Sequence, residues 1–394
     1  MTMHGPISGN GIAPAAGAGT VAIQQDPAVG PVSPAPRAGA HALLEGPRRT
    51  GLRRRRRLVL ALALATAGPT LAQAAEVNVY SYRQPDLIAP LLERFTAETG
   101  IEANVLFLDK GLTERIKAEG ANSPADVILT VDIGRLTEAV EAGVTQAVDS
   151  EAIEAGVPEA YRDPADQWFG LTTRARVVYA SKDRVEEDAL GYEDLADPKY
   201  RGRICTRSGQ HDYNLALFAT MIERLGEEGA EAWLAGLRDN LVGTPDGNDR
   251  AQAQKIHSGE CDIGLGNSYY LGLMATNEKE PEQKEWFESL KVIFPDAEGP
   301  GTHVNVSGMA MAANAPNREE ALKLMEFLAS PEAQEIYAGE VYEYPVAPGA
   351  EPSELVASFG TLDPDPTPLA TIAGHRRLAS ELVDRVGYDD GPSS

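Results

Sequence analysis

Residues 77–108 read VNVYSYRQPDLIAPLLERFTAETGIEANVLFL, and their pattern decides the fold class. Apolar and polar side chains alternate over residues 77–80, which predicts a strand. The helical spacing of apolar residues predicts a helix over 85–99, with Gly100 as its C-terminal cap. Residues 103–108 are the next strand candidate. A strand, a helix and a second strand in this order are typical of a parallel sheet in an α/β protein.

The same alternation continues along the rest of the chain. Further strands are predicted at 126–130, 176–180, 203–205 and 262–266, and further helices at 112–119, 135–142, 214–225, 230–240, 318–328 and 332–337. A loop rich in Asp and Pro at 158–166 separates two sets of elements, and 304–313 is a long apolar segment without helical periodicity. Two such α/β blocks predict two lobes with a ligand cleft between them.

The N-terminus has the composition of a processed leader. Residues 1–46 are rich in Ala, Gly and Pro, and we expect them to be a disordered extension. Residues 47–74 combine an Arg cluster, a short apolar run and the site Ala72-Gln73-Ala74, which predicts a signal peptide cleaved near Ala74 and a periplasmic location. The alternative is an N-terminal membrane anchor, although the apolar run is short for a span. The arginines leave twin-arginine and general export both open.

Composition and motifs exclude several function classes. The chain has 35 Lys+Arg against 59 Asp+Glu, a net charge of −24, which disfavours phosphate neutralisation and therefore nucleic-acid binding. The sequence contains no P-loop, no Gly-x-Ser-x-Gly elbow and no His-Glu-x-x-His helix, so we expect no enzyme activity. In an oxidising compartment Cys205 and Cys261 are expected to form a disulfide; the alternative is two buried thiols.

Tyrosines form the most informative group of side chains. Tyr269 and Tyr270 follow Gly266-Asn267-Ser268 at a strand end, and Tyr213 lies just before a helix. A disulfide between the two cysteines would connect the two segments, so that three phenols could converge. Deprotonated phenol is a hard oxygen donor that suits Fe3+, and three phenolates would balance its charge. The alternative is ordinary half-buried packing with the hydroxyls in water.

Three phenolates leave coordination positions open around a ferric ion. A bidentate anion such as carbonate could fill them, and an arginine would hold that anion through its fork geometry. Arg83, on the first strand-to-helix turn, is the main candidate, and Arg174 and Arg176 are further ones.

Eight stretches carry a resemblance to a known family. They are VYSYRQP (79–85), SPADV (123–127), WFGLTTRAR (168–176), YN (213–214), PDGNDR (245–250), GNSYY (266–270), GTHVN (301–305) and EYPV (343–346). In these residues the sequence resembles the periplasmic ferric-iron-binding proteins of ABC importers, which have the type II periplasmic-binding-protein fold. The resemblance extends in order over the chain that follows the leader.

The resemblance implies a ligand set. Carried over by position, it makes Tyr213, Tyr269 and Tyr270 the ferric ligands. Many members add a His after the first strand, but here Gln84 and Pro85 stand in that region, and neither suits Fe3+. This departure favours the subclass that uses three tyrosines plus an anion, with carbonate or bicarbonate as the candidate anion and arginine as its clamp.

The resemblance also implies a mode of action. The chain is expected to be a monomeric carrier, without membrane insertion after processing, that delivers iron to an ABC permease and its ATPase. The expected N-lobe is 75–174 with 304–345, the C-lobe is 175–303 with 346–394, and the hinge lies at 173–177 and 304–308. One alternative is a binder of phosphonate, thiamine or a polyamine with the same fold. Another is a secreted hydrolase that uses Asp126 or Asp132 with Arg135.

Overall fold

The computed structural model describes residues 75–393. The predicted extension at 1–46, the predicted signal peptide at 47–74 and its cleavage site lie outside the described residues. Within the described part of the chain, no helix is both long and apolar enough to cross a membrane.

The strands form one mixed sheet. They are β1 (Glu76–Ser81), β2 (Glu102–Phe107), β3 (Val127–Thr130), β4 (Thr145–Gln146), β5 (Phe169–Ser181), β6 (Ile204–Cys205), β7 (Ile263–Asn267), β8 (Leu290–Ile293), β9 (Val304–Ala312) and β10 (Tyr344–Pro345). Their order is β2-β1-β3-β9-β5-β7-β6, with β4 beside β9, and β8 and β10 beside β5. The pairs β1–β2, β1–β3 and β6–β7 are parallel, whereas every pair that includes β5 or β9 is antiparallel. The prediction of a parallel sheet is confirmed for these three pairs and is wrong for the pairs of β5 and β9, because these two strands run against their neighbours.

Helices cover the sheet. The α-helices are α1 (Pro85–Thr99), α2 (Leu112–Glu119), α3 (Ile133–Glu141), α4 (Glu151–Gly156), α5 (Asp212–Asp239), α6 (Asp249–Ser258), α7 (Tyr269–Ala275), α8 (Glu282–Glu288), α9 (Arg318–Leu328), α10 (Pro331–Val341), α11 (Glu354–Ala357), α12 (Leu369–Gly374) and α13 (Arg376–Val386). Short 3-10 turns lie at Gly120–Asn122, Glu159–Tyr161, Glu193–Ala196, Pro198–Tyr200 and Tyr388–Asp390. The predicted cap of α1 is confirmed, since Gly100 has a φ of 72°. The two helices predicted between 214 and 240 form one run, α5, which kinks at Gly226 (φ 71°).

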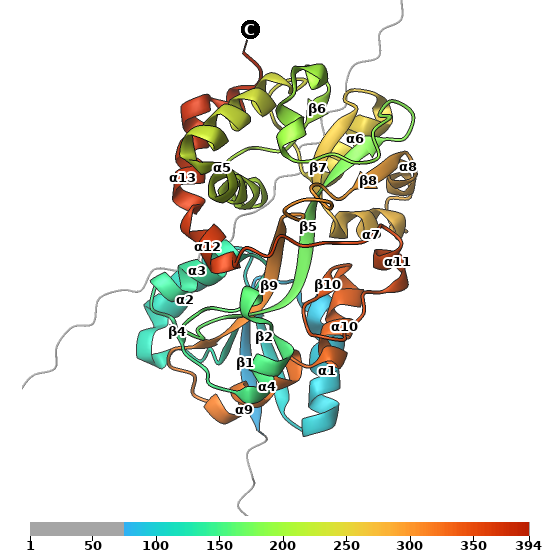
Figure 1. Ribbon diagram of the computed structural model, residues 1–394. Helices are drawn as coiled ribbons and strands as arrows, with labels where there is room; N and C mark the ends of the chain where they lie inside the picture. Colours follow the sequence, from blue (N-terminus) through green and yellow to red (C-terminus); the bar gives the residue numbers. More distant parts are fainter. Residues whose placement is uncertain (1–74, 394) are drawn as a thin grey trace, which may run out of the picture. The chain divides into compact units, whose positions relative to one another are not determined.

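Two long strands connect the two lobes (Figure 1). β5 is buried along its whole length and pairs with β9 as far as Ala175 opposite Val304. From Arg176 onward its partner is β7 in the second lobe. The fold is thus α/β and two-lobed, as expected. The predicted hinge segments lie within β5 and β9 at this change of partner, and the lobe boundaries and the hinge stay predictions.

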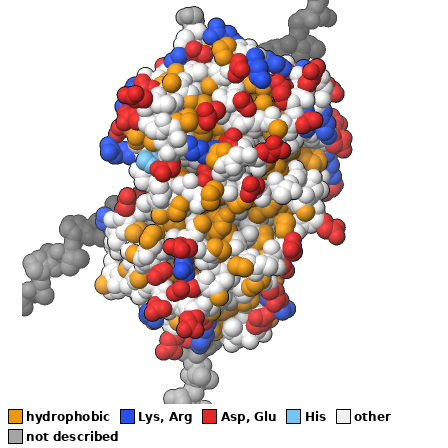
Figure 2. Space-filling model, viewed as in Figure 1, with side chains coloured by type: hydrophobic (Ala, Val, Ile, Leu, Met, Phe, Trp, Pro, Cys, Tyr) orange, Lys and Arg blue, Asp and Glu red, His pale blue; other side chains and the backbone are white. Residues whose placement is uncertain are grey.

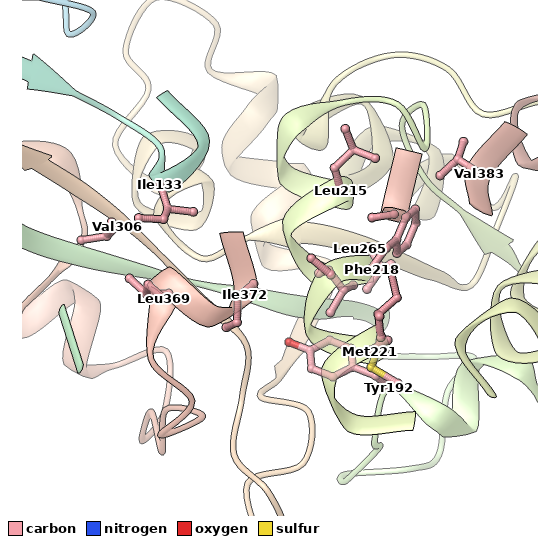
Figure 3. Close-up of a cluster of buried hydrophobic side chains, with 14 of the residues drawn as sticks. Ile133, Tyr192, Leu215, Phe218, Met221, Leu265, Val306, Leu369, Ile372 and Val383 are labelled. Carbon is pink, nitrogen blue, oxygen red and sulfur yellow. The ribbon is translucent and has the colours of Figure 1, made fainter. Parts of the chain in front are cut away.

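The hydrophobic core is continuous from one lobe to the other. Ile133 at the start of α3, Leu369 and Ile372 of α12 and Phe218 of α5 belong to one buried cluster (Figure 3). The C-terminal helices α12 and α13, which the sequence patterns do not predict, therefore pack on the helix that begins with the Tyr213 turn. Over the visible face of the molecule Asp and Glu are spread among Lys and Arg (Figure 2), so the acidic excess is not confined to one site there.

The predicted disulfide is confirmed. Cys205 and Cys261 are bonded, with an S–S distance of 2.04 Å and a sequence separation of 56 residues. The bond links the end of β6 to the residues that precede β7. The alternative of two free thiols is wrong for this pair.

Replacing both cysteines by Ala should lower the free energy of unfolding by about 4 kcal/mol, because the bond closes a loop of 56 residues in the unfolded chain. Urea unfolding monitored by circular dichroism measures this loss. The wild-type protein should fall to the variant's stability when dithiothreitol is present during unfolding, and the variant should not respond. Equal stability of the two proteins without reductant would contradict the prediction.

Acid should destabilise the fold through His303. Burial, together with the charge of Arg224, lowers the pKa of His303 to about 3, and its Nδ1 lies 2.7 Å from Thr220 Oγ1. In the unfolded chain the imidazole takes up a proton near pH 6.5, whereas in the folded protein it stays neutral down to about pH 3. The stability that neutral His303 contributes is therefore complete above pH 6.5 and is lost as the pH falls toward 3. The loss should be about 1.4 kcal/mol per pH unit. In His303→Asn this part of the pH dependence should disappear from urea unfolding measured between pH 7 and pH 4.5; parallel profiles of the two proteins would contradict it.

Candidate metal site

The structure brings the three predicted tyrosines together. Tyr213 lies in the first turn of α5, where its backbone N–H donates to His211 Nδ1, and Tyr269 and Tyr270 begin α7 directly after β7. The phenol oxygens of Tyr213 and Tyr269 are 3.2 Å apart, and the ring centroids of Tyr269 and Tyr270 are separated by 4.1 Å. Their role as metal ligands stays a prediction.

These tyrosines lie in the wall of an open cavity of about 510 Å³, and residues of both lobes line it. From the first lobe and its α10 end come Tyr82, Arg83, Gln84, Asp86, Leu87, Phe107, Asp109, Val131, Arg135, Arg174, Glu340, Val341 and Glu343. From the second lobe come Tyr213, Arg250, Tyr269, Tyr270 and Leu273. The cavity therefore combines phenol oxygens on one wall with arginines on both walls.

Burial favours the neutral phenols of Tyr269 and Tyr270 in the free protein. It raises the pKa of Tyr269 well above its ordinary value, and the nearby Tyr213 raises it further. Burial, again with help from Tyr213, raises the pKa of Tyr270 to about 12. A strongly charged cation at this point would reverse the balance, because its charge stabilises the phenolate form. These two tyrosines could therefore serve as phenolate ligands only beside a strongly charged cation.

Arg83 lies in the cavity wall as expected, but it already has an acidic partner. Its guanidinium donates to Glu343 Oε1 at 2.9 Å, to Ser307 Oγ at 2.8 Å and to Tyr337 Oη at 3.0 Å. Although burial alone would raise the pKa of Glu343, the charges of Arg83 and Arg174 hold it below its ordinary value. Glu343 stays ionised and offsets part of the positive charge that an anion would meet at Arg83.

Arg174 lies against the ring of Tyr213. It lines the cavity, its Cζ atom is 5.6 Å from the ring centroid of Tyr213, and its Nη1 donates to Ser307 Oγ at 3.3 Å. Its Nη2 is bonded to the Val131 carbonyl and lies 3.8 Å from Asp132 Oδ2. Burial raises the pKa of Asp132, and the charge of Arg174 opposes that rise. Arg174 thus lies in the cavity wall beside Tyr213, with the carboxylates of Glu343 and Asp132 as its acidic neighbours.

Arg176 is not among the residues that line the cavity. Its Nη1 donates to Asp249 Oδ2 at 2.6 Å and to Asn267 Oδ1 at 3.1 Å, and its Nη2 donates to Asn214 Oδ1 at 2.7 Å. Both terminal nitrogens are thus occupied by buried partners of the second lobe. This geometry argues against the expected anion role and requires a different explanation for this side chain.

Sequence reasoning missed two arginines near the phenols. The Cζ of Arg207 lies 5.1 Å from the ring centroid of Tyr213, and that of Arg250 lies 6.0 Å from the ring centroid of Tyr270. Arg250 belongs to the PDGNDR stretch, which could have indicated it. Nothing in the local pattern distinguished Arg207 from a surface residue.

The carboxylates of the hydrolase alternative have structural partners. Asp126 accepts from the backbone N–H groups of Asn78 and Asn317 at 2.8 and 2.7 Å. Asp132 caps α3 by accepting from Gly134 N–H at 2.7 Å and holds Asn305 of β9 at 2.8 Å. Both carboxylates are therefore used to connect segments of the first lobe.

Comparison with known proteins gives a consistent picture. Residues 122–358 match the family model described as bacterial extracellular solute-binding protein. Iron uptake protein A1 of Synechocystis is 45% identical over 327 residues, which cover 82% of this chain and 90% of that protein. The major ferric iron-binding protein of Neisseria meningitidis is 30% identical over 84% of this chain and 97% of its own length.

Solved structures agree with the fold. The ferric iron-binding protein A of Mannheimia haemolytica, in an open conformation, superposes with a TM-score of 0.78 at 50% identity, over 80% of this chain and all of that one. A Trichodesmium protein in complex with iron and citrate gives a TM-score of 0.77 at 42% identity, with the same coverage. The chain belongs to the bacterial extracellular solute-binding protein family, with the two-lobed fold of the periplasmic ferric-binding proteins.

Proposed function

We propose that this chain is a non-enzymatic, extracytoplasmic carrier that binds ferric iron between its lobes and delivers it to an ABC permease and its ATPase. The observation that carries the proposal is the meeting of Tyr213, Tyr269 and Tyr270 in one cavity. The names of the relatives, which refer to iron uptake and ferric iron binding, support it. In this proposal iron is the cargo, and the protein changes no covalent bond in it.

The chemistry of the donors suits a ferric ion. Each phenol gives up its proton on binding, and three phenolates supply hard oxygen ligands whose charges balance those of Fe3+. Carbonate or bicarbonate completes the coordination in our proposal. Of the predicted anion residues, Arg83 and Arg174 line the cavity, and they form the clamp.

Closure of the lobes completes the site. The cavity has walls from both lobes, so a rotation about 173–177 and 304–308 would enclose the ion. We further propose that the carrier acts as a monomer in the periplasm after removal of the leader at 47–74, with no membrane insertion of its own.

The formal charges that line the cavity balance. Four arginines, Arg83, Arg135, Arg174 and Arg250, and four acidic residues, Asp86, Asp109, Glu340 and Glu343, line it. The charge of the lining therefore does not separate a metal–anion pair from an organic cation. The three phenols favour the metal, because phenolate oxygens suit Fe3+.

Loss of one phenol should abolish the visible colour of the iron-loaded protein. Ferric iron and bicarbonate should give the wild type a broad phenolate-to-iron absorption band. Tyr269→Phe and Tyr270→Phe should weaken ferric binding by more than about 100-fold and bleach the band, because a ligand matters more than its supporting residues. Absorption titration against a competing chelator measures both effects.

Tyr342→Phe is the matched control. Tyr342 makes its hydroxyl contact with Thr276 at 2.8 Å and is not among the residues that line the cavity. This variant should keep the band and the affinity of the wild type. A colourless wild type, or full ferric affinity in both site variants, would contradict the proposed function.

Ferric binding should weaken as the pH falls, because protons compete with the metal for the phenol oxygens. The pKa values of Tyr269 and Tyr270 lie above the ordinary phenol value, so the protonated forms dominate across the neutral range. Between pH 8 and pH 6 the apparent affinity of Tyr270→Phe should depend on pH less steeply than that of the wild type, by about one proton. Competition titrations in the same buffer, anion and chelator cancel all other protonation steps; equal slopes would mean that Tyr270 loses no proton.

A further inference from the structure

One buried carboxylate joins the segments that carry all three tyrosines. Asp249, the first residue of α6, is fully buried. Its Oδ2 accepts from Arg176 Nη1 at 2.6 Å and from the backbone N–H of Asn267 at 2.9 Å, and its Oδ1 accepts from Arg207 Nη1 at 3.1 Å. The three donors come from β5, from the end of β7 and from the loop before α5. We call Asp249, Arg176 and Arg207 the buried hub.

The hub reaches the tyrosine pair through the backbone. Asn267 is the last residue of β7, and Tyr269 begins α7 two positions later. The bond from its N–H to Asp249 fixes the point where the chain leaves the strand. Arg176 also donates to the side chain of Asn267 at 3.1 Å, so this turn is held by both its backbone and its side chain. The direction in which the tyrosine pair enters the cavity depends on this turn.

The hub reaches Tyr213 by two further routes. Arg176 Nη2 donates to Oδ1 of Asn214, the neighbour of Tyr213, at 2.7 Å. The amide of Asn214 in turn donates to the carbonyls of Arg207 and Ser208 at 3.0 and 3.1 Å, which closes the loop before α5. The guanidinium of Arg207 packs at 5.1 Å from the ring centroid of Tyr213. Side chain and backbone around Tyr213 are thus tied to the same carboxylate.

The charges of the hub do not cancel. Two guanidiniums share one carboxylate, and within the described residues neither Arg176 nor Arg207 forms an ion pair with another acid. Three further N–H groups of this cluster are buried, and within the described residues none of them has a hydrogen-bond partner. They are Arg176 Nε, Arg207 Nε and Asn267 Nδ2. The hub therefore has a surplus of positive charge and of N–H donors next to phenols that must become negative. Burying an ion pair costs free energy of desolvation. If the only role of these residues were to hold the segments together, apolar side chains of similar size would do so equally well.

Building on the proposed function, we propose that the buried hub is the positioning device of the ferric site: Asp249 and Arg176 fix where the three phenols meet, and Arg207 adds positive charge beside Tyr213. None of the three residues touches the metal in this arrangement. They act through the tyrosines, so their loss should change the iron–phenolate spectrum and not only the stability.

The test uses Arg207→Gln, Arg207→Lys and Asp249→Asn in the full chain. Arg207→Gln should fold, since this side chain is partly exposed, with 12% of its surface accessible. It should bind ferric iron about 10- to 100-fold more weakly and shift the absorption band, because the Tyr213 phenolate loses a neighbouring cation. Arg207→Lys, which keeps the charge, should recover part of the affinity. Asp249→Asn should have the larger effect, and if it does not fold, the Arg207 pair decides the question alone.

Asp126→Asn is the matched control. Asp126 is also a fully buried carboxylate that accepts two backbone N–H groups, but it lies in the first lobe and contacts none of the tyrosine segments. It should lower the melting temperature and leave the position of the band unchanged. An Arg207→Gln protein with the affinity and the band of the wild type would overturn the proposal.

A second readout needs no iron. In apo protein labelled with 13C-tyrosine, Arg207→Gln should move the ring signals of Tyr213 and its two partners, and Asp126→Asn should leave them in place. A wild type that binds no iron, together with moved ring signals, would refute the proposed function while it supports the positioning role. Unmoved ring signals in Arg207→Gln would refute the positioning role whatever the protein binds.

Discussion

The parallel pairing of β6 with β7 is the constraint on which the site depends. Ile204 pairs with Ile263 and Cys205 with Gly264, so the two strands end at the same edge of the sheet. In a parallel arrangement the segments that leave the carboxyl ends of neighbouring strands must emerge side by side. The segment after β6 leads to Tyr213 and the one after β7 to the tyrosine pair. The disulfide reinforces this pairing, because it joins Cys205 of β6 to Cys261, which lies two residues before β7.

Convergence of the phenols sets up an electrostatic problem that explains their surroundings. In the free protein burial favours the neutral phenols, and two of them can lie 3.2 Å apart because one hydroxyl donates to the other. Once they lose their protons, the oxygens repel one another unless a strong cation lies between them. The arginines of the cavity and the unbalanced charge of the buried hub lower the cost of this state.

Local elements and the choice of tyrosines were predictable from the sequence, whereas long-range partners were not. The helices at 85–99, 112–119 and 318–328 have the predicted bounds because periodicity and caps are local signals. The antiparallel directions of β5 and β9 depend on pairings over more than 100 residues, and no local pattern encodes them. Arg174 and Arg176 lie on the same face of β5. Between them β5 changes its pairing partner from β9 to β7, and only Arg174 lines the cavity. The role of Asp249 could not be predicted from the sequence, since its three donors come from distant segments.

The most direct measurement is an anomalous-difference map, recorded at the iron absorption edge, from crystals of the protein grown with ferric iron and bicarbonate. The account predicts one strong peak in the cavity between the lobes, bonded to the phenol oxygens of Tyr213, Tyr269 and Tyr270, with an anion on the arginine side of the ion. A peak at any other position, or an iron ion from which one of these three rings is turned away, would contradict it.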